Sequence, residues 1–274
     1  MNAKRVCLSL ITILCLPAFS AFDPAFSARA QAKKVPPSPP VLQVGYVVIT
    51  PYNPNNLAVF ETFGEKGPNA EMPQAGVLST DLMSSAMIFV STSHKFSKDL
   101  GLAIVNPGST DGTVTFTLHD SDAVTIATNS ITLKAGAQTA QFVRQLFPKE
   151  PSVQGEFNGT VAISSTVPVA MVGLRFRGPN FSTVPVTATG PVSGVPGGAV
   201  ILPQFAEGRG WASEIVFINI GSGPLTVRAD FFGQDGKPMD VTLDGVTDHT
   251  FTTSAIPPGG VFILDPGDVS GDPF

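Results

Sequence analysis

The chain has 274 residues, of which 43% are hydrophobic and 14% are charged, and it contains 27 glycines, 25 prolines and two cysteines. Its net charge of −5 argues against a nucleic-acid partner, because surfaces that bind nucleic acids are basic. Both cysteines, Cys7 and Cys15, lie near the N-terminus. Removal of a leader would therefore leave no thiol for a disulfide, a cysteine metal site or thiolate catalysis.

The N-terminus has the pattern of a secretory signal peptide. A basic start precedes an apolar run of 11 residues, Val6–Leu16, and small residues then offer cleavage sites after Ala30 or Ala32. Eleven residues are too few to span about 30 Å of hydrocarbon, which favours cleavage over a membrane anchor. We predict a signal peptide over residues 1–30 and a secreted, periplasmic or cell-surface protein with no membrane span after cleavage.

Proline-rich and glycine-rich stretches divide the remaining chain. Residues 31–40 include Pro36-Pro37-Ser38-Pro39-Pro40, which predicts a stiff, extended linker. Residues 190–198 form the clearest internal linker, Gly-Pro-Val-Ser-Gly-Val-Pro-Gly-Gly. These boundaries predict a first unit over residues 41–189 and a second, shorter unit over residues 199–274 that ends in an acidic tail.

One pattern occurs twice, at Leu100–Leu118 and at Glu214–Phe231. In each copy, two runs of alternating apolar and polar residues flank a turn rich in glycine and proline, and Asn106 matches Asn219 at an offset of 113. A period of two predicts a β-strand with one face on the core, whereas a helix would be broken by the turn. Each copy is therefore predicted to be an antiparallel hairpin with one solvated face.

Apolar runs separated by turn residues recur along the chain, as is typical of a sandwich or barrel. The runs are Val44–Ile49, Leu57–Phe63, Gly76–Thr80, Met87–Ser91, Leu100–Val105, Val114–Leu118, Val124–Thr128, Ser130–Leu133, Gly159–Ser164 and Val169–Phe176. Residues 138–147 differ, because their apolar side chains recur at intervals of four, which predicts one short helix. Pro168 within an apolar run predicts an edge strand or a bulge.

The second unit lacks counterparts of two late runs of the first, Gly159–Phe176 and Phe181–Val186. A sheet without them would leave backbone groups unpaired. Three solutions remain open from the sequence. The N-terminal strands Val44–Phe63 could fill the gap, the second unit could close as a small sandwich, or a neighbouring chain could add a strand. The last solution implies self-association through a sheet edge.

Several runs resemble uncharacterised secreted bacterial repeat proteins with immunoglobulin-like sandwich units. These runs are Gly101–Gly108, Thr113–Leu118, Ala140–Pro148, Phe157–Ser165 and Val172–Arg177. The resemblance covers about residues 44–264 and implies export and an all-β fold of two immunoglobulin-like antiparallel β-sandwich units in tandem. Its motifs are structural, so no site residue is implied.

Residues that could carry chemistry are dispersed. His94, His119 and His249 lack the spacing of metal ligands, and the polar segment from His119 to Asp122 predicts a hairpin turn. The sequence contains no Gly-x-Ser-x-Gly nucleophile elbow. We therefore predict a protein that is not an enzyme.

The C-terminal segment from Arg228 to Phe274 holds eight aspartates. Five of them recur every four or five residues: Asp230, Asp235, Asp240, Asp244 and Asp248. Carboxylates in glycine-rich turns can bind calcium, but no EF-hand loop is present and aspartate also favours turns. The sequence predicts no cofactor, with calcium as the alternative.

These observations predict an exported, non-enzymatic structural or adhesion-type protein of the cell envelope or extracellular space. Its partner would be a protein or a cell-surface polymer. The alternative is a carbohydrate- or ligand-binding accessory module, for which Trp211, Tyr46 and Tyr52 are the candidate aromatic contacts.

Overall fold

The computed structural model describes residues 45–49, 59–64, 74–189, 202, 205–206 and 213–266. These residues are mostly β-strand, their strands pair antiparallel, and their helices are two segments of four residues. The predicted all-β, antiparallel class is therefore confirmed. The predicted leader, both predicted linkers, Tyr52 and Trp211 lie outside the described residues.

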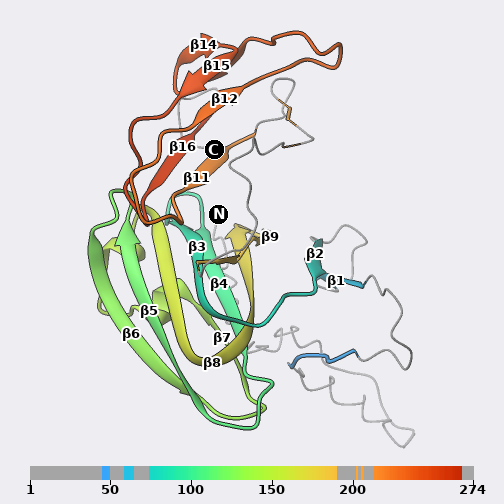
Figure 1. Ribbon diagram of the computed structural model, residues 1–274, viewed down its shortest axis with the longest axis vertical. Helices are drawn as coiled ribbons and strands as arrows, with labels where there is room; N and C mark the ends of the chain where they lie inside the picture. The colour runs from blue at the N-terminus through green and yellow to red at the C-terminus, as the bar shows by residue number, and fades with distance from the viewer. Residues whose placement is uncertain are drawn as a thin grey trace, which may run out of the picture.

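A sandwich of two sheets forms the larger body of the molecule (Figure 1). One sheet has the strand order β10 (Thr187–Ala188), β3 (Met83–Thr92), β8 (Phe157–Arg177), β5 (Gly112–Asp120) and β6 (Thr125–Leu133). The other has the order β7 (Gln138–Phe142), β4 (Lys98–Val105), β8 and β9 (Asn180–Val184). A hairpin of β1 (Phe60–Gly64) and β2 (Gln74–Leu78) contacts β9.

Strand β8 is 21 residues long and belongs to both sheets. Its first part pairs with β3 and β5, and its second part, from Ala170, pairs with β4. Pro168 lies between the two parts, beside a register shift in the pairing with β3. Proline cannot donate a ladder hydrogen bond, so it is tolerated where the strand leaves one sheet for the other. The irregularity predicted at Pro168 is confirmed.

Side-chain alternation builds the core of the sandwich. On β5, Val114, Phe116 and Leu118 have no exposed surface, whereas the threonines between them face outward. Strand β4 buries Leu100, Leu102 and Ile104 in the same way. Other fully or largely buried members of this core are Ala86, Ile88, Val90, Leu133, Val143, Leu146, Phe147, Val153, Val161, Ile163, Val169 and Met171. The alternation with one solvated face is confirmed for the first copy, but the predicted hairpin is wrong. Strand β4 pairs with β7 and β8, and β5 pairs with β6 and β8, so the two runs lie in different sheets because distant strands supply their backbone hydrogen bonds. The second copy is not a hairpin either, since Ile215–Ile218 and Arg228–Asp230 pair with other strands.

The helix predicted over residues 138–147 is only partly present. Residues Gln138–Phe142 form β7, because β4 supplies their backbone hydrogen bonds, and only Val143–Leu146 are helical (α1). The Gln145 side chain accepts a hydrogen bond from the Phe142 backbone N–H at the start of this turn. A second short helix, α2 (Pro151–Gln154), follows, and the two runs predicted around residue 129 form one strand, β6.

A smaller set of strands follows from residue 213. It consists of the pairs β11 (Ile215–Ile218) with β16 (Val261–Leu264), β12 (Arg228–Asp230) with β15 (Thr250–Thr252), and β13 (Val241–Leu243) with β14 (Val246–Asp248). A separate apolar cluster centres on Phe231, Val241, Leu243 and Leu264. Within the described ranges, these strands form ladders with one another and none with β1 or β2.

The smaller set of strands packs on one end of the sandwich (Figure 1). The Thr160 hydroxyl, fully buried on β8, donates to the Gly259 carbonyl at 2.9 Å. The backbone N–H of Val261 donates to the Ser121 carbonyl at 2.9 Å. Arg175 lies 2.9 Å from the Glu214 carboxylate, which is only 7% exposed. The contact between the two parts is therefore hydrogen-bonded and contains buried polar groups.

Asn106 and Asn219 make the same set of hydrogen bonds in the two corresponding turns. Each is at most 2% exposed. The Asn106 amide donates to the carbonyls of Thr110 and Leu133 and its oxygen accepts from the Gly108 N–H. The Asn219 side chain does the same with residues 223, 256 and 221. In each case one side chain closes its own turn and ties that turn to a later strand or loop.

Replacing Asn106 by alanine leaves the buried Leu133 carbonyl without this donor and also removes the part-buried hydrogen bond to the Thr110 carbonyl. We expect Asn106→Ala to lower the free energy of unfolding by about 2–4 kcal/mol, measured by urea denaturation. Asn106→Asp should also destabilise, because a carboxylate cannot donate to the two carbonyls. The exposed Asn180 is the matched control, and Asn180→Ala should change stability by less than about 0.5 kcal/mol. Equal effects of the two alanine variants would contradict this role.

Candidate functional site

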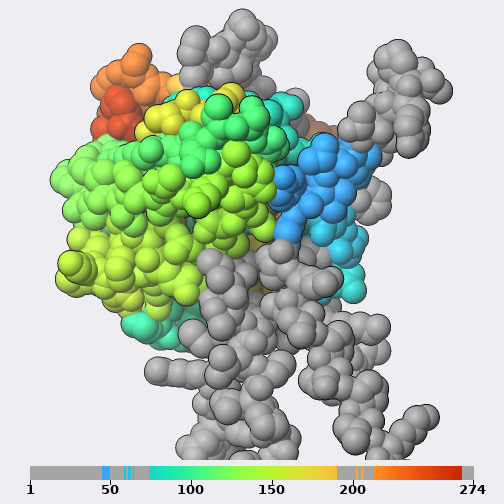
Figure 2. Space-filling view, turned by 90° about the horizontal axis from the view of Figure 1, so that it is seen from below, coloured from blue at the N-terminus to red at the C-terminus, as the bar shows by residue number. Residues whose placement is uncertain are grey.

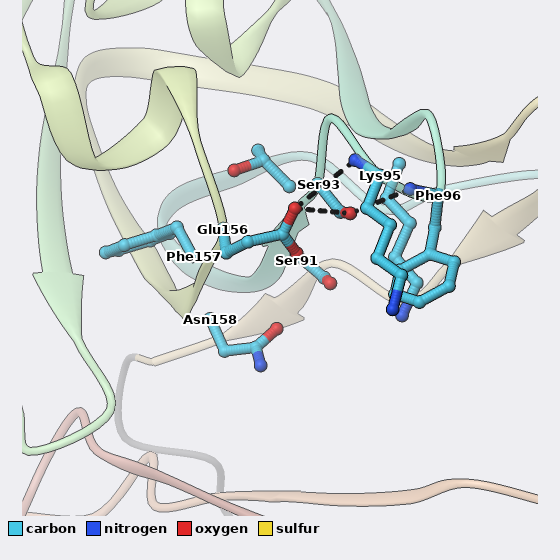
Figure 3. Close-up of a pocket in the computed structure, with 9 residues that line it drawn as sticks. Ser91, Ser93, Lys95, Phe96, Glu156, Phe157 and Asn158 are labelled. Carbon is cyan, nitrogen blue, oxygen red and sulfur yellow. Dashed lines mark hydrogen bonds between the residues drawn. The ribbon is translucent and has the colours of Figure 1, made fainter. Parts of the chain in front are cut away.

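A pocket of about 540 Å³ lies at the end of the sandwich that faces the smaller set of strands (Figure 3). It lies between the tip of the β3–β4 hairpin and the start of β8. The lining residues are Ser91, Thr92, Ser93, Lys95, Phe96, Lys98, Glu156, Phe157 and Asn158.

The hairpin tip is shaped by local hydrogen bonds. Ser93 and Lys98 close the hairpin with two backbone hydrogen bonds of 3.1 and 2.9 Å, and Ser97 adopts a left-handed φ of 52°. The Ser93 hydroxyl accepts from the Phe96 N–H at 3.0 Å and donates to Glu156 Oε1 at 2.8 Å. The tip is thus held by Glu156, a residue more than fifty positions away in the chain.

The Glu156 carboxylate is ionised at neutral pH. Burial acts to raise its pKa, but hydrogen bonds from the Ser93 hydroxyl and from the backbone of Lys95 and His94, with the nearby Lys98 ammonium, bring the pKa below its ordinary value. Hydrogen bonds to a carboxylate favour its charged form. The residue therefore supplies a fixed negative charge at the base of the hairpin tip.

Three cations surround the Phe96 ring. Lys95 Nζ lies 4.9 Å from the ring centroid, Lys98 Nζ lies 5.5 Å from it, and the Arg177 guanidinium carbon lies 5.4 Å from it. An aromatic face attracts cations, so the ring helps to hold like charges close together. Lys98 and Arg177 also stand directly opposite each other in the β4–β8 ladder. Like charges in that position repel, so the arrangement concentrates positive charge beside the pocket.

Lys98 is the most buried of these cations, with 5% of its surface exposed. Burial lowers its pKa, and the charges of Arg175 and Arg177 lower it further, while Glu214 and Asp265 act to raise it. An anion entering the pocket would favour the charged form of Lys98.

A second polar group lies on the adjoining part of β4. Burial raises the pKa of Asp99 to about 6, although the Arg144 guanidinium, 3.6 Å away, and the Leu100 N–H both act to lower it. Arg144 also donates to the Lys98 carbonyl at 3.2 Å and lies 3.2 Å from His94 Nδ1. Arg144 therefore connects Asp99 to the base of the hairpin.

The arrangement offers charge and hydrogen bonds. Lysine and arginine attract an anionic group, and Ser91 and Asn158 can hydrogen-bond to hydroxyls. In Figure 3 the Asn158 side chain lies on the opposite side of the pocket from Lys95 and Phe96. The lining therefore combines the positive charges of Lys95 and Lys98 with the negative charge of Glu156, which already accepts hydrogen bonds from Ser93 and Lys95, and it suits a polar ligand whose anionic group reaches the lysines.

Tyr46, the one described residue of the three aromatic residues predicted as ligand contacts, does not line this pocket. Tyr46 is 40% exposed, and its hydroxyl donates to the Gly136 carbonyl at 3.4 Å. Trp211 and Tyr52 lie outside the described residues, so their predicted role remains a prediction. The sequence signal that would have pointed to the pocket is the basic and aromatic run Lys95-Phe96-Ser97-Lys98.

The polar segment from His119 to Asp122 forms a hairpin turn, as predicted. One Asp120 oxygen accepts from the N–H groups of Asp122 and Val124, at 3.0 and 2.9 Å. His119 Nδ1 is buried and has no hydrogen-bond partner, and burial lowers the pKa of this imidazole.

In the acidic segment, Asp240, Asp248 and His249 place one ligand atom each within 4.8 Å of one another. All three are exposed, and one Asp248 oxygen already accepts from two backbone N–H groups. Calcium in proteins takes six to eight oxygen ligands, so this cluster by itself is a poor calcium site. Calcium binding remains the alternative prediction for the segment.

No family model and no curated protein matches this chain. Among solved structures, the Anabaena sensory rhodopsin transducer is similar over 33% of this chain and 93% of its own, with 20% identity and a TM-score of 0.29. Thermotoga maritima 1070 is similar over 39% of this chain and 91% of its own, with 13% identity and a TM-score of 0.30. Similarity of this size does not assign a family.

Asp99 should make stability depend on pH. A folded-state pKa of about 6, against the ordinary 3.8 of an aspartate, means that the folded protein binds this proton more tightly than the unfolded chain does. Stability from this group is therefore greatest below about pH 4, falls as the pH rises to about 6, and stays low above that. Asp99→Asn should raise the free energy of unfolding at pH 8 by about 1–2 kcal/mol and remove this part of the pH dependence.

Urea denaturation between pH 4 and 8 would test this expectation, with about one-unit steps to resolve the transition. The control is Asp122→Asn in the exposed turn, which should leave the pH profile unchanged. A destabilised Asp99→Asn variant at pH 8 would contradict the assignment, since it would mean that the pair with Arg144 outweighs the cost of burial.

Proposed function

We propose that this chain is an exported, non-enzymatic structural or adhesion-type protein of the cell envelope or extracellular space, in which two β-sandwich units act as one stiff block. The observation that carries the proposal is the contact between the sandwich and the C-terminal strands. A protein that displays or spaces a surface must hold its parts at a fixed distance, and domains joined only by a polar, exposed contact move relative to each other.

The buried hydroxyl of Thr160 supports a fixed contact. Its hydrogen bond to the Gly259 carbonyl is buried. Opening the contact would break this bond and expose the hydroxyl and the carbonyl to water, which costs free energy until both are hydrated again. The Arg175–Glu214 pair lies in the same region, and a buried carboxylate without its partner is costly. Both features favour one relative orientation of the two parts.

The matching hydrogen bonds of Asn106 and Asn219 support two units of related design in tandem. Both side chains tie a glycine turn to a later part of the same unit. We interpret both units as immunoglobulin-like, with the second shortened and closed as a small sandwich of its own. The antiparallel pairs of residues 213–266 favour this solution over completion by the N-terminal strands.

Export rests on the predicted leader at residues 1–30. In the part of the chain that the structure describes, no helix has the length and apolar character needed to cross a membrane. The mature protein would carry 13 basic and 20 acidic residues, a net charge of −7.

Fractionation of a Gram-negative host expressing the full chain tests export. We expect the protein outside the cytoplasm, with an N-terminus at Gln31 or Lys33 by Edman or mass-spectrometric sequencing. Ala30 occupies a small-residue position of both cleavage sites, so Ala30→Arg should block both and leave the precursor uncleaved. Gln31→Asn is the control and should be processed normally. Uncleaved wild-type protein in the cytoplasm would refute the proposal.

The second candidate function is a ligand-binding accessory module that uses the pocket at the hairpin tip. The observation that favours it is the convergence of Lys95, Lys98 and Arg177 on the Phe96 ring beside hydroxyl and amide groups. An acidic saccharide combines the carboxylate and the hydroxyls that such a lining recognises.

Isothermal titration calorimetry with tri-galacturonate tests this candidate. We expect binding that weakens as salt is raised, and a dissociation constant that increases about tenfold or more in Lys95→Gln with Arg177→Gln, because two attractive charges are lost. A neutral trisaccharide should not bind. Lys134→Gln, on an exposed lysine outside the pocket, is the control. Equal binding by the double variant would exclude this pocket.

A further inference from the structure

Lys98 is a buried lysine at the end of the sandwich that lies beside the C-terminal strands. That end is turned away from the viewer in Figure 2, which shows the molecule from the opposite end. Lys98 is the first residue of β4, and the alternation of the strand turns its side chain inward, in line with Leu100 and Leu102. It is only 5% exposed, and it lines the pocket of about 540 Å³. A basic group therefore occupies a core-facing position and borders a space that a small molecule can enter.

Positive charges crowd this side chain. Arg177 stands directly opposite Lys98 in the β4–β8 ladder, and Arg175 is the next inward-pointing residue of β8. Lys95 Nζ and Lys98 Nζ lie 4.9 and 5.5 Å from the centroid of the same Phe96 ring. Burial and neighbouring like charges both favour the neutral amine of a lysine over its ammonium form. The pKa of Lys98 is accordingly lowered, with burial as the largest cause.

Acidic groups near Lys98 act in the opposite direction. Glu214 and Asp265, from the C-terminal part, act to raise the pKa of Lys98. Glu214 lies 2.9 Å from Arg175, which offsets its negative charge. Glu156 also faces Lys98 across the pocket, and its carboxylate accepts hydrogen bonds from the hairpin tip. Because the net shift is downward, a larger share of Lys98 than of an exposed lysine is the free amine, which is the nucleophilic form.

We propose that Lys98 is a covalent binding site that captures small aldehydes carrying an anionic group, by forming an imine with them. The charges of the site select this class, because a free amine attacks a carbonyl carbon and the charges of Lys95 and Arg177 attract a carboxylate. This inference deepens the second candidate function, since it uses the same pocket. It does not require that pocket to bind a saccharide.

The reaction balances without a further reactant. The Lys98 amine forms a C–N bond with the carbonyl carbon as an electron pair of the C=O bond moves to the oxygen. The oxygen takes two protons in turn and leaves as water, and a C=N bond remains. From the ammonium form, the net change is ammonium and aldehyde to protonated imine and water. The product keeps the positive charge of Lys98, so the attraction of Glu214 and Asp265 for this side chain is retained.

Reductive labelling of the purified protein tests the proposal. Sodium cyanoborohydride supplies a hydride that converts an imine into a stable secondary amine, which mass spectrometry of chymotryptic peptides locates. We expect glyoxylate, an aldehyde with a carboxylate, to label Lys98 at least about fivefold faster than the exposed Lys134 at pH 7. Acetaldehyde, which has no carboxylate, should show a smaller preference for Lys98. Raising the salt to about 0.5 M should reduce the preference of glyoxylate and leave that of acetaldehyde unchanged.

A variant tests the cause of the reactivity. Arg177→Gln should slow the labelling of Lys98 by acetaldehyde about threefold or more, because removal of a like charge favours the ammonium form. Arg228→Gln, on an exposed arginine of the C-terminal strands, is the control and should label like the wild type. Circular dichroism and the melting temperature check that each variant is folded, and the comparison of Lys98 with Lys134 in the wild type needs no variant.

Wild-type Lys98 that reacts no faster than Lys134 would overturn the proposal. So would a folded Arg177→Gln protein whose Lys98 reacts with acetaldehyde at the wild-type rate. Binding of tri-galacturonate without selective labelling would refute only the covalent capture, whereas selective labelling without saccharide binding would refute only the saccharide as the ligand of this pocket.

Discussion

The bend of β8 at Pro168 is the constraint on which the rest of the structure depends. A strand of 21 residues cannot remain in one sheet of a small sandwich, so its first part is hydrogen-bonded in one sheet and its second part in the other. The bend returns the end of β8 toward its start. Asn158 and Arg177, at opposite ends of the strand, therefore both reach the tip of the β3–β4 hairpin.

That return creates the polar end of the sandwich. On β4 and β8, the side chains that point inward are apolar deeper in the core, as Leu100 and Met171 are. Nearer the end of the sandwich the inward-pointing side chains are charged, as Lys98 and Arg175 are. The C-terminal strands cover part of this end with Glu214, and the pocket lies beside the covered region. One group of charged residues thus contributes both to the contact between the two parts and to the candidate ligand pocket. A substitution in the contact should therefore change the charge of the pocket, and a substitution in the pocket should change the contact. The reason is that the pKa of Lys98 responds both to Glu214 and to Arg177.

Much of the fold was predictable because its signals are local. Alternation in Val114–Leu118 follows from the geometry of a strand with one buried face, and the turn at Asp120 follows from side-chain hydrogen bonds to nearby N–H groups. The helix predicted over Gln138–Phe147 was only partly correct, because the conformation of this segment depends on a strand that is distant in the sequence. Its apolar side chains do recur every four residues. Residues Gln138–Phe142 are nevertheless stabilised more by backbone hydrogen bonds to β4 than they would be by one more helical turn. The pocket was missed because Glu156 and Ser93 are brought together only by folding.

The sequence by itself determined the strand class, the turns, the irregularity at Pro168 and the correspondence of Asn106 with Asn219, since each depends on neighbours within a few residues. Only the tertiary structure decided which strands share a sheet and how the two ends of β8 meet. Those outcomes depend on hydrogen bonds and burial between residues far apart in the chain, whose free energy no local pattern records.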